Sequence, residues 1–97
     1  MMGYEITSTE GRRIYIKHNL RDELNGFIML IKTIESELSG RIVQIDGDDI
    51  QYIIQGDPKE VVYRWESGCN IVAVTKQEAD VAEVVDMLKS QFEKLNI

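Results

Sequence analysis

Apolar residues recur between positions 20 and 38 at alternating spacings of four and three residues, which is the most regular pattern in the chain. These residues are Leu20, Leu24, Phe27, Ile31, Ile34 and Leu38. Because a helix advances about 100° per residue, they share one narrow stripe, which predicts an amphipathic helix that buries one face. Asn19 lies where the N-cap is expected, Asp22 and Glu23 place negative charge in the first turn, and Gly40 marks the end.

Short segments of alternating apolar and polar residues lie on both sides of this helix. Residues 4–8 and 13–17 alternate around a turn that contains Gly11. Residues 41–45 and 50–55 are rich in β-branched side chains and are joined by a turn with an Asp-Gly pair. Alternating runs around such turns are typical of antiparallel hairpins, so the sequence predicts one hairpin before the helix and one after it.

Residues 57–68 fit two different secondary structures. An Asp-Pro-Lys-Glu capping box at the start, with proline at the first helical position, and Gly68 as a stop favour a short helix. As a strand, the segment would place Val61, Tyr63 and Trp65 on one face, and these residue types favour strands. We favour the short helix because its cap, proline and stop agree with one another, and the strand is the alternative.

The last third of the chain begins with an uninterrupted apolar run over residues 71–74, which is typical of a central strand covered on both faces. Residues 75–78 form a second capping box, which predicts a helix ending near Leu95. Its apolar stripe comprises Val81, Val84, Val85, Leu88, Phe92 and Leu95. The sequence therefore predicts a single two-layer α+β domain over residues 1–97, of order ββαββ(α)βα, with two long helices on a mixed or antiparallel sheet.

Composition narrows the class of protein. The 97 residues are 43% hydrophobic and 29% charged, values typical of one globular domain. The net charge of −6 has no basic cluster of the kind that phosphate binding requires, so we expect no nucleic-acid partner. The longest apolar run, residues 27–31, is too short to cross a bilayer, and no signal pattern precedes it. We therefore expect a soluble cytoplasmic protein without a membrane partner.

Few residues in the sequence are candidates for metal binding, catalysis or cofactor binding. Asp46, Asp48 and Asp49 place three carboxylates in the second hairpin turn, and hard cations take several oxygen ligands, although the spacing does not match an EF-hand loop. Cys69 and His18 are the only thiol and the only imidazole, and no catalytic signature surrounds either one. The phosphate-binding glycine motifs of nucleotide sites are absent from the sequence, so we predict no cofactor.

Charged and off-stripe residues suggest contacts with other molecules. On a strand, Arg13, Tyr15 and Lys17 share one face, which fits a solvated outer sheet face and, as an alternative, a small anion-binding strip. Met29 and Met87 lie away from the helical stripes, and Tyr63 would be exposed on a short helix. We take these three as interface residues.

Three hypotheses about function follow. The first is a non-catalytic protein-interaction or assembly module that binds a partner protein or forms a homodimer. The second is a divalent-cation or small-ligand-binding protein that uses the acidic turn at residues 46–49. The third is an enzyme whose site is assembled from residues distant in sequence, a class that the absence of catalytic motifs disfavours.

Overall fold

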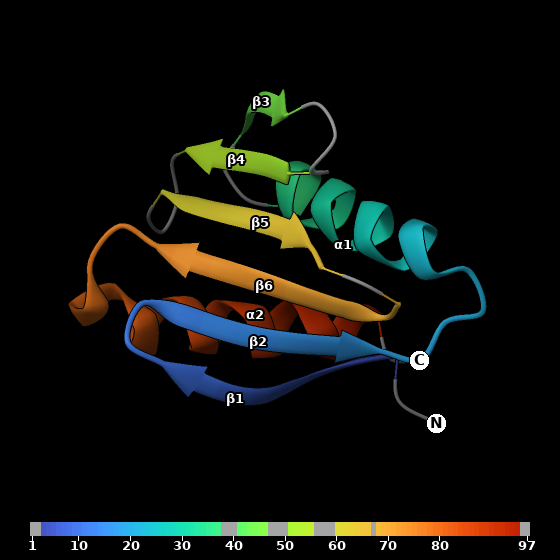
Figure 1. Cartoon of the computed structure of the whole chain (residues 1–97), viewed down its shortest axis with the longest axis horizontal. Helices are drawn as coiled ribbons and strands as arrows, with labels where there is room; N and C mark the ends of the chain where they lie inside the picture. Colours follow the sequence, from blue (N-terminus) through green and yellow to red (C-terminus); the bar gives the residue numbers. More distant parts are fainter. Residues whose placement is uncertain (1–2, 38–40, 47–50, 56–59, 67, 96–97) are drawn as a thin grey trace.

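The chain forms a small α+β domain with an antiparallel sheet and two long helices in the computed structural model (Figure 1). The structure describes residues 3–37, 41–46, 51–55, 60–66 and 68–95, with side chains described outside 37, 41–46 and 51–55. The strands are β1 (Tyr4–Glu10), β2 (Arg13–His18), β3 (Arg41–Asp46), β4 (Gln51–Gln55), β5 (Val61–Trp65) and β6 (Asn70–Thr75). The helices are α1 (Glu23–Glu37), a short 3₁₀ turn (Glu78–Asp80) and α2 (Val81–Leu95).

The sheet has the strand order β1-β2-β6-β5-β4-β3, and each pair of neighbours is antiparallel. Both hairpins predicted from the sequence, β1–β2 and β3–β4, are confirmed. Gly11 takes a φ of 59° in the first turn, a value that a residue with a side chain rarely adopts. The two edge strands each contain a register shift, between Ile6 and Ser8 in β1 and between Ile42 and Gln44 in β3. Such bulges disfavour the addition of a further strand at an edge.

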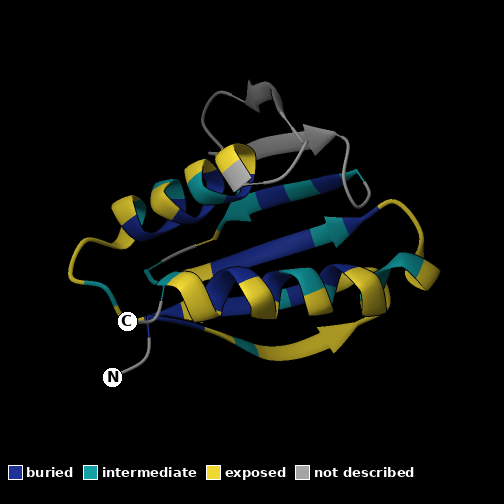
Figure 2. Ribbon diagram, turned by 180° about the vertical axis from the view of Figure 1, so that it is seen from behind, coloured by how far each residue is buried: buried dark blue, intermediate teal, exposed yellow. Residues whose placement is uncertain are grey.

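Helices α1 and α2 both lie over the same face of the sheet, which is seen from the helix side in Figure 2. The central part of the α1 stripe is confirmed, because Phe27, Ile31 and Ile34 are buried against the sheet together with Leu30. Leu20 lies before the start of the helix, and Leu38 lies outside the described residues. Helix α2 buries four residues: Val84, Leu88, Gln91 and Phe92. Gln91 was not predicted, because only its apolar neighbours were counted, yet it falls seven residues after Val84 on the same face.

The short helix predicted for residues 57–68 is wrong where the structure describes the segment. Residues 61–65 form β5, which pairs with β4 on one side and with β6 on the other. Val61 and Tyr63 point into the core, as the strand alternative required. Pairing on both sides satisfies the backbone groups of β5, and this outweighs local cap signals. Gly68 does not end a helix; it takes a φ of 59° in the β5–β6 turn, where its carbonyl accepts the Trp65 indole N–H at 2.9 Å.

Both predicted helix caps also differ from the structure. Helix α1 begins after Asp22, whose Oδ1 accepts the backbone N–H of Asn25 at 2.8 Å, so Asp22 and not Asn19 is the N-cap. The hydroxyl of Thr75 donates to the carbonyl oxygen of Gln77 at 2.7 Å, and the residue that precedes the next helical turn is Gln77, which makes no side-chain cap hydrogen bond. A 3₁₀ turn therefore precedes α2 in place of the predicted capping box.

The sheet face opposite the helices carries no helix in the described part of the chain, and we call it the open face (Figure 1). Its described residues on β1, β2, β6 and β5 are Glu5, Ser8, Glu10, Arg13, Tyr15, Lys17, Asn70, Val72, Val74, Val62 and Arg64. Strand β6 is central, as predicted, but no helix covers its outer side. Val72 is nevertheless only 3% exposed, since it lies directly between Tyr15 of β2 and Arg64 of β5.

None of the helices in the described ranges combines the length and the apolar character that a bilayer crossing requires.

Candidate functional site

His18 lies in the interior where β2 ends and α1 begins, and only 2% of it is exposed. Its Nδ1 accepts the backbone N–H of Leu20 at 3.1 Å, so the ring proton is on Nε2. Nε2 then donates to the carbonyl oxygen of Glu23 at 2.8 Å. Both ring nitrogens of the chain's only histidine are therefore bound to backbone groups, and neither is free to accept a proton from a substrate.

Tyr4 and Gly26 complete this hairpin–helix junction. A Cβ added to Gly26 would overlap the His18 ring, so the ring packs directly against the helix backbone. The Tyr4 hydroxyl donates to the carbonyl oxygen of Gly26. The Tyr4 ring lies 5.7 Å from the His18 ring and stacks on Phe92 of α2 at 5.5 Å, measured between centroids. Burial raises the Tyr4 pKa to about 12. Through these contacts the junction joins β1, β2, α1 and α2.

Cys69 lies beside this junction but does not form a catalytic pair with His18. The two residues meet through their backbones, with the His18 N–H donating to the Cys69 carbonyl at 3.0 Å. The Cys69 Sγ is 4.0 Å from the carbonyl oxygen of Leu20 and is partly buried. A cysteine nucleophile needs a base to accept its proton, and both nitrogens of His18 are already bound. The partly buried thiol packs in the turn as a small apolar side chain does.

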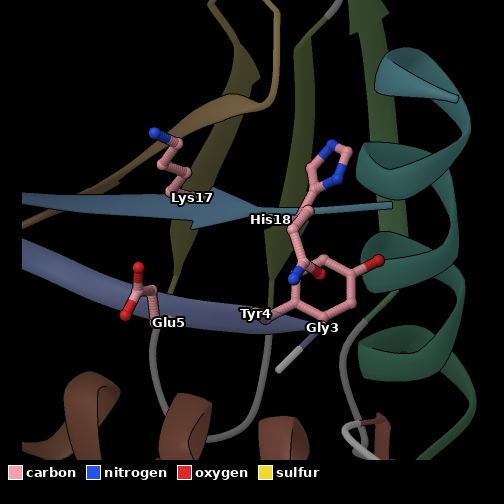
Figure 3. A pocket seen from close by; sticks show the side chains of 6 residues that line it. Gly3, Tyr4, Glu5, Lys17 and His18 are labelled. Atoms are coloured by element: carbon pink, nitrogen blue, oxygen red, sulfur yellow. The ribbon is translucent and has the colours of Figure 1, made fainter. Parts of the chain in front are cut away.

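A small hollow of about 70 Å³ lies at the open end of the β1–β2 hairpin (Figure 3). Its lining residues are Gly3, Tyr4, Glu5, Lys17, His18 and Asn19. Glu5 and Lys17 project on the side away from α1, whereas the Tyr4 ring lies toward that helix, so the polar groups do not converge on one point (Figure 3). This volume holds only a few water molecules, and it does not form a ligand site.

A larger hollow of about 300 Å³ lies on the open face beside the β1 bulge. Its lining residues are Thr7, Ser8, Tyr15, Ile16, Glu66, Asn70 and Ile71. The Thr7 hydroxyl donates to the Tyr15 carbonyl at 3.3 Å. A hydrogen bond with Tyr15 raises the Arg13 pKa, and the negative charges of Glu10 and Glu66 raise it further, so charges of both signs lie around this hollow.

The predicted cation site in the acidic turn lies largely outside the described residues. Asp46 is the last residue of β3, and Asp48 and Asp49 lie outside the described residues. Within the ranges that the structure covers, no three His, Cys, Asp or Glu side chains lie where they could hold a metal ion. Cation binding by the turn stays a prediction, and it is tested by following the amide resonances of residues 47–50 in millimolar Ca²⁺ and Mg²⁺.

The three predicted interface residues lie in three different environments. Met29 is 42% exposed on α1 and is the one large exposed apolar side chain found among the described residues. Met87 is half-buried and packs against the core. Tyr63 is only 1% exposed, so the expectation that it lies at the surface is wrong. Its hydroxyl meets no hydrogen-bonding partner among the described residues, and burial raises its pKa well above the ordinary value.

The open face as a whole was not predicted as a site, and only its part formed by Arg13, Tyr15 and Lys17 was considered, as an alternative anion-binding strip. Its signal in the sequence was the alternation of Arg13, Tyr15 and Lys17, which the structure places on the outer side of β2. The outward positions of β6 and β5 showed no alternation of apolar and polar residues. The continuous apolar run over residues 71–74 is also what a strand buried on both faces shows, so it did not indicate an uncovered face. Comparisons with protein-family models, with curated proteins and with solved structures found no match to this chain.

Proposed function

We propose that this chain is a non-catalytic protein-interaction module that binds a partner protein through the open face. One observation carries the proposal: Val62, Val72 and Val74 occupy the outward positions of β5 and β6, with Tyr15 beside them on β2. An antiparallel sheet with one face in water normally alternates apolar residues inside with polar residues outside. Valine at three adjacent outward positions departs from this rule: Val62 and Val74 are partly exposed there, whereas Val72 is covered by its neighbours. Apolar side chains at the outward positions of a sheet mark contact surfaces.

The state of the titratable groups favours binding over catalysis. None of the acidic side chains that the structure describes is buried, so none lies in the desolvated cleft that a general acid or base requires. The imidazole of His18 is bound on both nitrogens, and the Cys69 Sγ lies near a backbone carbonyl, that of Leu20. A module that acts by contact needs none of these groups.

The proposal is tested by crosslinking in the cells that make the protein. A photo-crosslinking amino acid in place of Val62 samples the open face, and the same amino acid in place of Met29 samples the helix side of the molecule. We expect discrete protein adducts from position 62 and few from position 29, with each adduct identified by mass spectrometry. Adducts from position 29 alone, or none from either position, would overturn the proposal.

A further inference from the structure

We draw no further inference here: the strongest candidate, the hollow of about 300 Å³ on the open face beside the β1 bulge, takes its polar lining from the exposed side chains of Thr7, Ser8, Glu66 and Asn70, and nothing in the structure shows what covers it.

Discussion

Gly26 shows how a single contact reverses the usual effect of a substitution. Replacing a helical glycine by alanine normally stabilises a helix by about 1 kcal/mol. At position 26 the added methyl group would overlap the His18 ring, which is fixed by two backbone hydrogen bonds. Overpacking of a buried site costs about 1–3 kcal/mol, and a rigid ring puts the cost at the upper end of that range.

We therefore expect Gly26→Ala to lower the free energy of unfolding by about 1–2 kcal/mol, measured by urea denaturation. Ser36→Ala, at an exposed position of the same helix, is the control, and its effect should stay within about 0.5 kcal/mol of zero. If Gly26→Ala were as stable as the wild type or more so, the direct packing of His18 on the helix backbone would be refuted.

Tyr4 and Tyr63 form a matched pair of buried hydroxyls. The Tyr4 hydroxyl donates to the Gly26 carbonyl, whereas the Tyr63 hydroxyl has no partner in the described structure. A buried hydrogen bond contributes about 1 kcal/mol, and an unsatisfied buried group costs about 1–3 kcal/mol. We expect Tyr4→Phe to lose about 1 kcal/mol of stability and Tyr63→Phe to lose none or to gain about 1 kcal/mol. Thermal unfolding of the two variants side by side measures the difference, and equal losses would contradict it.

The same two tyrosines make stability depend on alkaline pH. An unfolded tyrosine titrates near pH 10.0, whereas burial raises the pKa of folded Tyr4 to about 12 and that of Tyr63 further. The folded state therefore holds these protons more tightly, so the stability is fully present below pH 10 and is lost as the pH rises toward 12. Urea midpoints should be level between pH 8 and 9 and fall above pH 10. The fall should be smaller for Tyr63→Phe, and an identical fall would exclude a contribution from Tyr63.

At the level of secondary structure, the start of α1 depends on one side chain. Asp22 accepts the N–H of Asn25, and N-cap residues contribute about 1 kcal/mol to the helix that they begin. We expect Asp22→Ala to lower the free energy of unfolding by about that amount in a denaturant titration. Asn19→Ala removes the residue that the sequence pattern favoured as the cap, and it should leave stability nearly unchanged. The reverse order of effects would place the cap at Asn19.

The errors of the sequence-based prediction have a common physical cause. Hairpins and amphipathic helices were predicted correctly because turn residues and the spacing of apolar residues act locally. The segment of β5 was predicted as a helix because its cap signals are local, whereas its strand state depends on pairing with β4 and β6. The open face was missed for the same reason, since which side of Val72 lacks a helix is decided by residues distant in sequence.

At the scale of the whole molecule, both helices cover one face of the sheet, and the open face carries no helix among the described residues. Bulges in both edge strands oppose growth of the sheet sideways, so the open face is the part of the sheet that is left for contact with another molecule. The net charge of −6 makes copies of this chain repel one another on average, and dissolved salt screens that repulsion.

The salt concentration changes the electrostatic repulsion between two copies of this chain. Two molecules of charge −6 with centres about 25 Å apart repel by about 6 kcal/mol in water before screening. With a Debye length of about 30 Å at 0.01 M salt, about 2.6 kcal/mol of this repulsion survives, whereas at 0.15 M, with about 8 Å, almost none does. The dissociation constant of any self-association should therefore fall at least tenfold between these two salt concentrations, measured by sedimentation. A contact between unlike charges weakens as salt rises, so a dissociation constant that rose with salt would contradict control of association by the net charge.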